Sequence, residues 1–276
     1  MSLTARVAAR FKEKKENPNG GAPIYLYSKG QVAHRNREKA KRLEKLRGSI
    51  KNLRDQVKED LKSDDPTTSL TALAVALIDH TYERVGNDTS ASGESNEKGE
   101  KHYGVTTWRK NHVSFGKGKA TVKYVGKSGV KQTKTVTDKA IVTALRNAYE
   151  GCEGDDIFCH SSGKVNATKV NAYLKQFDIT AKDLRGFHAN REMQDRLREV
   201  RSKGGNLPED TKEREAKLKK EFKEALEETA KAVGHEASTL RSQYLVPKLE
   251  DSFLKDGTVL GKMKAASVVI RFLSEA

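Results

Sequence analysis

Residues 233–244 read VGHEASTLRSQY, and this stretch places a histidine and a tyrosine on either side of a predicted helix boundary. Gly234 is suited to end a helix, because glycine readily adopts the left-handed conformation of a C-terminal cap. A cap at Ser238 would then begin a short helix that carries Tyr244. In one continuous helix, His235 and Tyr244 would point in opposite directions, whereas this break lets both face one ligand. The phenol is therefore a candidate nucleophile.

Both residues also have an ordinary interpretation. Taken alone, His235 is more often a histidine at a helix end, and Tyr244 more often an aromatic core residue whose hydroxyl is satisfied. The residues upstream favour chemistry, because two arginines and a lysine occur there in suitable contexts: Arg84 in YERVGN, Lys127 in VGKSGV and Arg185 in KDLRGF.

The two arginines are predicted at positions that need or attract an anion. Arg84 lies seven residues after Leu77, so a helix continuing through both would point Arg84 inward with the apolar stripe. A buried guanidinium needs an anionic partner, and a core carboxylate or an outward-reaching side chain is the alternative. Arg185 lies in the opening turns of a helix capped by Thr180 and Asp183, where anions bind, although a salt bridge is equally possible there.

Lys127 lies in a predicted hairpin turn, where most lysines are simply solvated. The same exposure would let its ammonium group reach a leaving oxygen and protonate it. The letters GKS do not form a nucleotide-binding P-loop, because Thr121 stands where that motif needs glycine and no helix follows. The lysine, the two arginines, His235 and Tyr244 together could break a phosphodiester bond without a metal.

The charge balance favours a polyanionic partner. Among 276 residues there are 53 Lys and Arg against 38 Asp and Glu, a net charge of +15. DNA or RNA is the expected partner, because no apolar run approaches the ~20 residues of a membrane-spanning helix. Basic amphipathic stretches lying on a lipid surface are the alternative.

The amino terminus and the cysteines bear on the compartment. The start, MSLTARVAARFKEKK, lacks the apolar core of a signal peptide, so we expect a cytoplasmic, nucleoid or nuclear protein that is not secreted. An amphipathic transit peptide is the alternative. Cys152 and Cys159 are the only cysteines, and we expect two free thiols in a reducing compartment. With His160 they do not form a metal-binding spacing, so no metal site is predicted.

The periodicity predicts an α+β, mostly helical catalytic domain at 31–276 with a small antiparallel three-stranded sheet, preceded by a basic arm at 1–30 without regular structure. One predicted helix has an apolar stripe from Leu43 to Leu61. Its other faces carry cations from Lys39 to Lys62, which are either solvated or face phosphates. The other predicted segments are a helix from Pro66 to Arg84, a mobile loop near 87–101, a meander over 106–136, helices at 137–149, 167–177 and 181–200, a charged helical insertion near 200–232, and a helix at 260–274.

Six segments carry a resemblance to type IB DNA topoisomerases, particularly the small poxvirus and bacterial forms. They are YLYSKGQVAHRN at 25–36, RVGN at 84–87, YGVTTWRKNHV at 103–113, KYVGKSG at 123–129, KDLRGFHAN at 182–190 and VGHEASTLRSQY at 233–244. The resemblance implies that Tyr244 is the nucleophile that takes the 3′ phosphate. It also implies that Arg84, Arg185 and His235 hold the transition-state oxygens and that Lys127 is the general acid for the 5′ oxygen.

The resemblance also implies relaxation of supercoiled duplex DNA by transient strand cleavage, with neither ATP nor a metal as cofactor. A monomer holding the duplex in a C-shaped grip is expected, with no membrane partner. The DNA-binding residues implied by the matched segments are Tyr25, Tyr27, Lys29, Arg35, Lys182 and Asn190.

Tyrosine recombinases and integrases resemble these enzymes and are the alternative. They usually carry His-x-x-Arg at the second arginine, whereas this chain has Lys182-Asp-Leu-Arg185. Gly186 departs from the topoisomerase pattern, which often has Thr there. The β-rich clamp domain of small topoisomerases is expected to be absent or truncated, because only about two dozen residues precede Tyr25.

Overall fold

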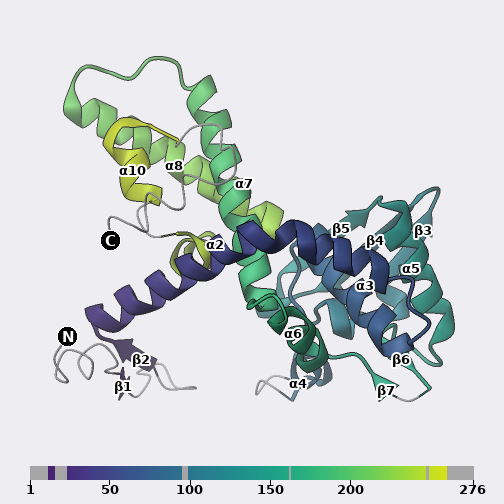
Figure 1. Ribbon diagram of the computed structural model, residues 1–276. Helices are drawn as coiled ribbons and strands as arrows, with labels where there is room; N and C mark the ends of the chain where they lie inside the picture. Colours follow the sequence, from purple (N-terminus) through teal and green to yellow (C-terminus); the bar gives the residue numbers. More distant parts are fainter. Residues whose placement is uncertain (1–11, 16–23, 95–98, 162, 247–248, 260–276) are drawn as a thin grey trace.

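A long helix, α2, crosses the molecule and connects its two parts (Figure 1). The computed structural model describes residues 12–15, 24–94, 99–161, 163–246 and 249–259. Its helices are α2 (Lys29–Asp60), α3 (Pro66–Thr81), α4 (Asp88–Ser92), α5 (Lys139–Gly151), α6 (Ala167–Lys175), α7 (Ala181–Lys203), α8 (Thr211–Val233), α9 (Ala237–Thr239) and α10 (Leu249–Asp256). Its strands are β1 (Lys12–Lys15), β2 (Ile24–Tyr27), β3 (Val113–Gly116), β4 (Lys119–Val125), β5 (Lys131–Val136), β6 (Cys159–His160) and β7 (Gly163–Lys164). The predicted α+β, mostly helical class is confirmed.

The amino-terminal arm contains a strand pair that the sequence did not predict. β1 and β2 are antiparallel, with Lys12 opposite Tyr27 and Lys15 opposite Ile24. Strands this short show no readable alternation, so only their pairing defines them. Ser28 then caps α2 by accepting a hydrogen bond from the backbone of Gln31, and the helix begins well before the predicted start. Its first turns carry few apolar residues, so they show no apolar periodicity from which a helix could be predicted.

Helix α3 is the centre of the first hydrophobic core. Asp65 caps it, Pro66 occupies its first turn, and its residues from Leu70 to Ile78 are buried on every face. The helix ends at Thr81, because Tyr82 adopts a left-handed conformation with φ of 63°. The prediction that the helix continues through Arg84 was therefore wrong. Arg84 follows the helix and is not positioned by a helical face.

The predicted three-stranded meander is confirmed, with the strands in the order β3-β4-β5. Val113 lies opposite Val122, and Tyr124 lies opposite Gln132. The inward side chains of β4 and β5 alternate with exposed ones and are buried against the first core, as half-buried strands require.

The two cysteines form a disulfide, so the prediction of two free thiols was wrong. Cys152 follows α5, Cys159 lies in β6, and their Cα atoms are 5.5 Å apart, within the range that a disulfide spans. The turn between α5 and β6 brings together two residues whose spacing alone gave no sign of pairing.

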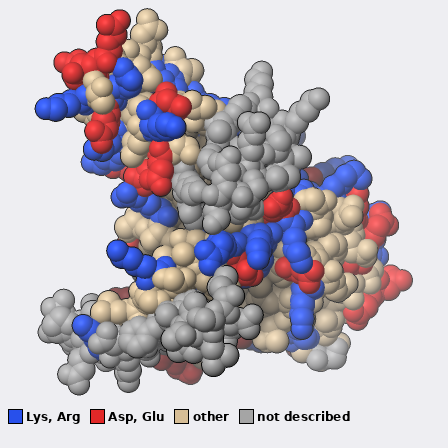
Figure 2. All heavy atoms as spheres, turned by 60° about the vertical axis from the view of Figure 1, so that its left-hand side comes forward, with Lys and Arg blue, Asp and Glu red and all other residues tan. Residues whose placement is uncertain are grey.

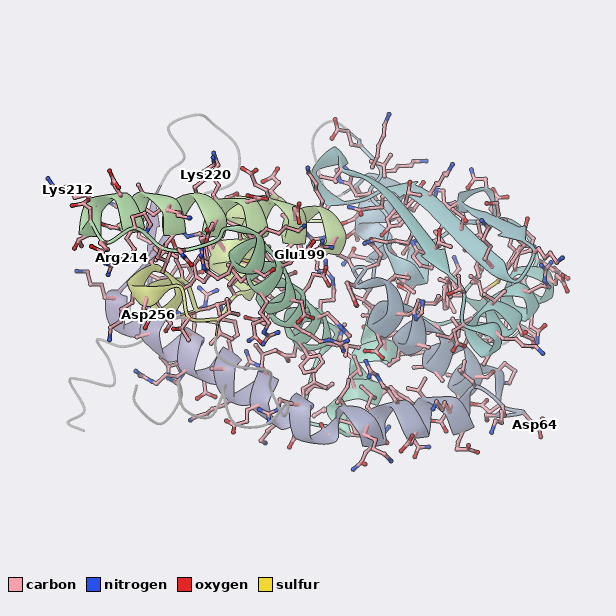
Figure 3. All side chains as sticks on the ribbon, turned by 90° about the horizontal axis from the view of Figure 1, so that it is seen from above. Asp64, Glu199, Lys212, Arg214, Lys220 and Asp256 are labelled. Atoms are coloured by element: carbon pink, nitrogen blue, oxygen red, sulfur yellow. A yellow bond between two sulfur atoms is a disulfide. The ribbon has the colours of Figure 1, made fainter. Side chains whose placement is uncertain are left out.

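Helices α7, α8 and α10 enclose a second hydrophobic core. The apolar side chains of α8, from Leu218 to Val233, are buried against α7, and Phe253 of α10 packs on Phe222 with ring centroids 6.2 Å apart. From above, the labelled Lys212 and Lys220 project outward from α8, away from this core (Figure 3). Helix α10 was not predicted, and the helix predicted at 260–274 lies outside the described residues.

The segment predicted as a mobile loop near 87–101 contains the short helix α4, which Asn87 caps through its side-chain oxygen. Residues 95–98 of that loop lie outside the described part. None of the described helices is long and apolar enough to cross a membrane.

We predict that Phe253→Ala lowers the free energy of unfolding by ~3–5 kcal/mol, because the deletion leaves a cavity between α8 and α10. Phe253 is fully buried, whereas the neighbouring Lys255 is exposed, so Lys255→Ala is a matched control. Urea unfolding followed by circular dichroism measures both changes. Equal stabilities of the two variants would contradict the packing described for α10.

Candidate active site

Tyr244 ends a π-helical turn, Leu240–Tyr244, in which the Leu245 amide bonds to the Leu240 carbonyl at 3.1 Å. Single π turns are uncommon and often lie at functional sites. The Tyr244 side chain is buried, and its ring centroid lies 4.3 Å from that of His235. The turn begins after α9, which Glu236 precedes as the capping position, so the predicted cap at Ser238 was wrong.

Arg185 is buried beside Tyr244 and uses all three of its side-chain nitrogens. One terminal nitrogen donates to the Tyr244 hydroxyl at 2.8 Å, and the other lies 2.9 Å from Nε2 of His235. Its Nε donates to the Tyr82 carbonyl at 2.7 Å. The predicted capping box of Thr180 and Asp183 is present at the start of the same helix. Within the described residues, no salt bridge joins Arg185 to a carboxylate, so the alternative of a structural ion pair fails.

Arg84 completes the cluster from the opposite side of the imidazole. Its terminal nitrogen lies 3.1 Å from Nδ1 of His235. His235 is held by its backbone amide, which donates to the Ala230 carbonyl just after Gly234 ends α8 with φ of 66°. The predicted break at Gly234 is confirmed, and it does bring His235 and Tyr244 together.

The cluster contains more positive charge and more donors than its own residues can satisfy. Burial and then the charges of Arg185 and Arg84 lower the pKa of His235 from 6.5 to about 3, so the ring is neutral. A neutral imidazole has one acceptor nitrogen, and arginine nitrogens only donate. Only one arginine can therefore donate to His235, and the other faces an N–H group. An anion placed between them would accept from both.

Glu83, a buried carboxylate whose charge acts on Arg185, already has two partners. Glu83 accepts a hydrogen bond from the Tyr124 hydroxyl and lies 3.4 Å from the Lys134 ammonium group. Its charge also favours the charged form of Arg185, although no salt bridge joins the two side chains within the described residues.

Asn190 holds the backbone that carries Tyr244. Its amide nitrogen donates to the carbonyls of Gly186 and Tyr244, each at 2.8 Å, and its oxygen accepts from the Val246 amide at 2.7 Å. These contacts place the Asn190 side chain in a buried, supporting position.

Gly186 is the residue at which the sequence departs from the topoisomerase pattern. It lies against Leu43 of α2, and a Cβ atom added at Gly186 would come within 3.4 Å of the leucine side chain.

Lys127 is the one predicted catalytic residue that does not join the cluster. It lies in the turn between β4 and β5 as predicted, and its side chain is exposed. The base of this hairpin is nevertheless tied to the cluster, because Gln132 donates to the Gly234 carbonyl at 3.4 Å and Lys134 to that of Ala232 at 2.5 Å.

A cavity of about 540 Å³ lies in front of Tyr244 and is lined by predicted DNA-binding residues. Tyr27, Arg35 and Lys182 border it, and the Lys182 ammonium group lies 5.7 Å from the centre of the Tyr244 ring. The Arg35 guanidinium stacks over the Tyr27 ring at 4.8 Å. Lys29 is exposed at the start of α2, and the side chain of Tyr25 lies outside the described part.

Sequence reasoning did not single out Lys39, which borders the same cavity. Its ammonium group donates to the Leu245 carbonyl at 2.8 Å, and burial, Lys182 and Arg35 lower its pKa to about 8. Its place on the cationic face of α2 was the available signal.

Figure 2 shows lysine and arginine side chains gathered across the middle of one face. Within the described residues, no group of His, Cys, Asp or Glu has the arrangement of a metal site.

An α+β fold that buries a tyrosine among two arginines and a histidine defines the class of type IB topoisomerases and tyrosine recombinases. The sequence matches the family described as eukaryotic DNA topoisomerase I, catalytic core, over residues 28–253. The chain therefore belongs to this family of type IB DNA topoisomerases.

Two similar proteins can be compared with this chain. A DNA topoisomerase 1B of Acanthamoeba polyphaga mimivirus is 25% identical over 242 residues, which cover 82% of this chain and 67% of that protein. A crystal structure of the XerH site-specific recombinase, in a post-cleavage complex with a palindromic difH substrate, matches with 14% identity and a TM-score of 0.41. That match covers 73% of this chain, which spans 47% of the length of the recombinase.

We predict that His235 makes the protein less stable in acid. Its pKa in the folded state, about 3, lies below its ordinary value of 6.5, so between these pH values unfolding takes up a proton. The free energy of unfolding therefore falls as the pH drops from about 6.5 towards 3, and His235→Gln makes this fall shallower. Urea unfolding at several pH values, with His80→Gln at an exposed position of α3 as control, measures the difference. Identical pH profiles for wild type and His235→Gln would contradict the electrostatics described here.

Proposed function

We propose that this chain relaxes supercoiled duplex DNA by cutting one strand through a covalent 3′-phosphotyrosine and then resealing it. The observation that carries the proposal is the buried Arg185 guanidinium, whose two terminal nitrogens contact the Tyr244 hydroxyl and His235. A buried cation that forms no salt bridge with a carboxylate is able to bind a phosphate placed beside the phenol.

In the proposed reaction, the Tyr244 oxygen attacks the phosphorus, and the bond from phosphorus to the 5′ oxygen breaks. Arg84, Arg185 and His235 donate to the non-bridging oxygens, where negative charge develops. The phenol gives its proton to water as the new bond forms, and the 5′ oxygen takes a proton from the Lys127 ammonium group as it leaves. The free end then rotates, and the reverse attack by the 5′ hydroxyl releases the tyrosine. One phosphodiester replaces another, so the cycle requires neither ATP nor a metal.

Lys127 is proposed as the acid that protonates the 5′ oxygen. An exposed lysine on a hairpin can move into a groove once DNA fills it, and catalytic contacts often tighten only in the complex. The ties from Gln132 and Lys134 to the end of α8 support this role, because they anchor the base of the same hairpin beside His235.

Duplex DNA is proposed to lie over the cavity in front of Tyr244. Arg35 and Lys182 border this cavity, Lys29 lies at the start of α2, and phosphate contacts from such residues dominate affinity for DNA. Asn190 is assigned a supporting role here, since its amide is engaged by the backbone. We propose that the enzyme acts as a monomer, in the cytoplasm, nucleoid or nucleus.

We predict that Tyr244→Phe abolishes relaxation while duplex binding persists, because the ring remains and only the nucleophilic oxygen is lost. Plasmid relaxation in EDTA and binding to a labelled duplex measure the two properties. Tyr149→Phe, which removes a hydroxyl away from the cluster, is the control and should relax plasmid like wild type. Relaxation by Tyr244→Phe, or a wild-type enzyme that is inactive in EDTA, would overturn the proposal.

We predict that Lys127→Ala slows cleavage by ~10²–10⁴, the usual contribution of a general acid. A duplex with sulfur in place of the 5′ leaving oxygen needs little protonation, so the variant should cut it almost as fast as wild type does. Arg185→Ala should be slow on both duplexes. Lys131→Ala, which changes a lysine on the same hairpin as Lys127, is the control and should cut both duplexes as fast as wild type does. If sulfur rescued both Lys127→Ala and Arg185→Ala, or neither variant, the proposed roles would be wrong.

A further inference from the structure

Tyr82 combines a strained backbone with a contact to the catalytic cluster. It ends α3 in the left-handed region with φ of 63° and ψ of 17°, a conformation that is unfavourable for a residue with a Cβ atom. In that conformation its carbonyl accepts the hydrogen bond from Nε of Arg185 at 2.7 Å. Because Nε is engaged there, the two terminal nitrogens of the guanidinium are directed at Tyr244 and His235.

The Tyr82 ring is held by His188. The two rings stack with centroids 4.3 Å apart and planes 20° from parallel. His188 lies on α7 three residues after Arg185, so both residues face the end of α3 from nearly the same side of their helix. One segment of α7 therefore contacts Tyr82 twice: His188 stacks on its ring and Arg185 donates to its carbonyl.

His188 is in turn held by Asp79. Nε2 of His188 lies 2.6 Å from a carboxylate oxygen of Asp79, and Arg54 of α2 binds the same carboxylate through two nitrogens at 2.7 and 3.2 Å. Burial alone would raise the pKa of Asp79, but the hydrogen bonds from His188 and Arg54 outweigh it and lower the pKa, so the carboxylate is charged. His188 is almost fully buried.

We propose that Asp79 and His188 are positioning residues that keep Tyr82 in its left-handed conformation, so that the Tyr82 carbonyl orients Arg185 for catalysis. This inference rests on the proposed function. In this proposal each of the three residues acts through the guanidinium of Arg185 and not on the phosphate itself.

Substitutions at Tyr82 separate the contributions of the ring and of the backbone. Tyr82→Phe keeps the stacked ring and should cleave like wild type. Tyr82→Ala loses the ring and keeps the backbone penalty, so single-turnover cleavage should slow by ~10–10², as expected when a catalytic group shifts by about 1 Å. Tyr82→Gly also loses the ring, but glycine adopts this conformation without strain and should retain more activity than alanine. Equal rates for the alanine and glycine variants would contradict the role given to the backbone.

His188→Ala tests whether the contact between His188 and Tyr82 acts through Arg185. It should slow cleavage by ~10–10², and the sulfur-substituted duplex should not rescue it, because Arg185 does not act on the leaving oxygen. Combined with Arg185→Ala, it should cause little further loss, since residues that act as one unit are not additive. His80→Ala, at an exposed position of α3, is the control.

The outcomes distinguish this inference from the proposed function. If both Tyr82→Ala and His188→Ala cleave DNA as fast as wild type does, the positioning role is wrong while the proposed function stands. Full additivity with Arg185→Ala, or rescue by sulfur, also overturns the positioning role. A wild type that cleaves neither duplex overturns the proposed function itself. If His188→Ala does not fold, the comparison of Tyr82→Ala with Tyr82→Gly decides the question alone.

Discussion

The buried guanidinium of Arg185 is the constraint on which the rest of the site depends. A cation removed from water needs compensation, and here its hydrogen bonds go to a carbonyl, a phenol and an imidazole instead of a carboxylate. Those partners come from the end of α3, the π turn after α9 and the end of α8. Three segments distant in sequence are thereby brought to one side chain. The fold supplies the donors, and a phosphate would supply the missing negative charge.

Helix α7 links this site to both hydrophobic cores. Its first turns, with Leu184, pack in the core around α3, whereas Ala189 and Met193 pack in the core shared with α8 and α10. Arg185 lies between these two sets, where the cores meet. The arginines and the neutral His235 gather positive charge that burial makes unfavourable. Such a site sacrifices stability for function, as electrostatically preorganised sites commonly do.

The sequence predicted most of this arrangement where local signals are strong. Gly234 marked the break that brings His235 to Tyr244, and the box of Thr180 and Asp183 marked the helix start near Arg185. It failed where a tertiary contact decides the local structure. No local pattern shows that Tyr82 is left-handed, because tyrosine seldom is, so the helix was extended to Arg84. The pairing of Cys152 with Cys159 depended on a turn whose geometry the spacing does not encode.

The central claim is that Tyr244, and no other residue, exchanges bonds with a DNA phosphate in this cluster. The most direct measurement is to trap wild type on duplex DNA with denaturant, digest the adduct with protease and nuclease, and locate the attached nucleotide by mass spectrometry. The account predicts a nucleotide joined through its 3′ phosphate to the peptide that contains Tyr244. A nucleotide on any other of the eight tyrosines, or a 5′ linkage, would contradict it.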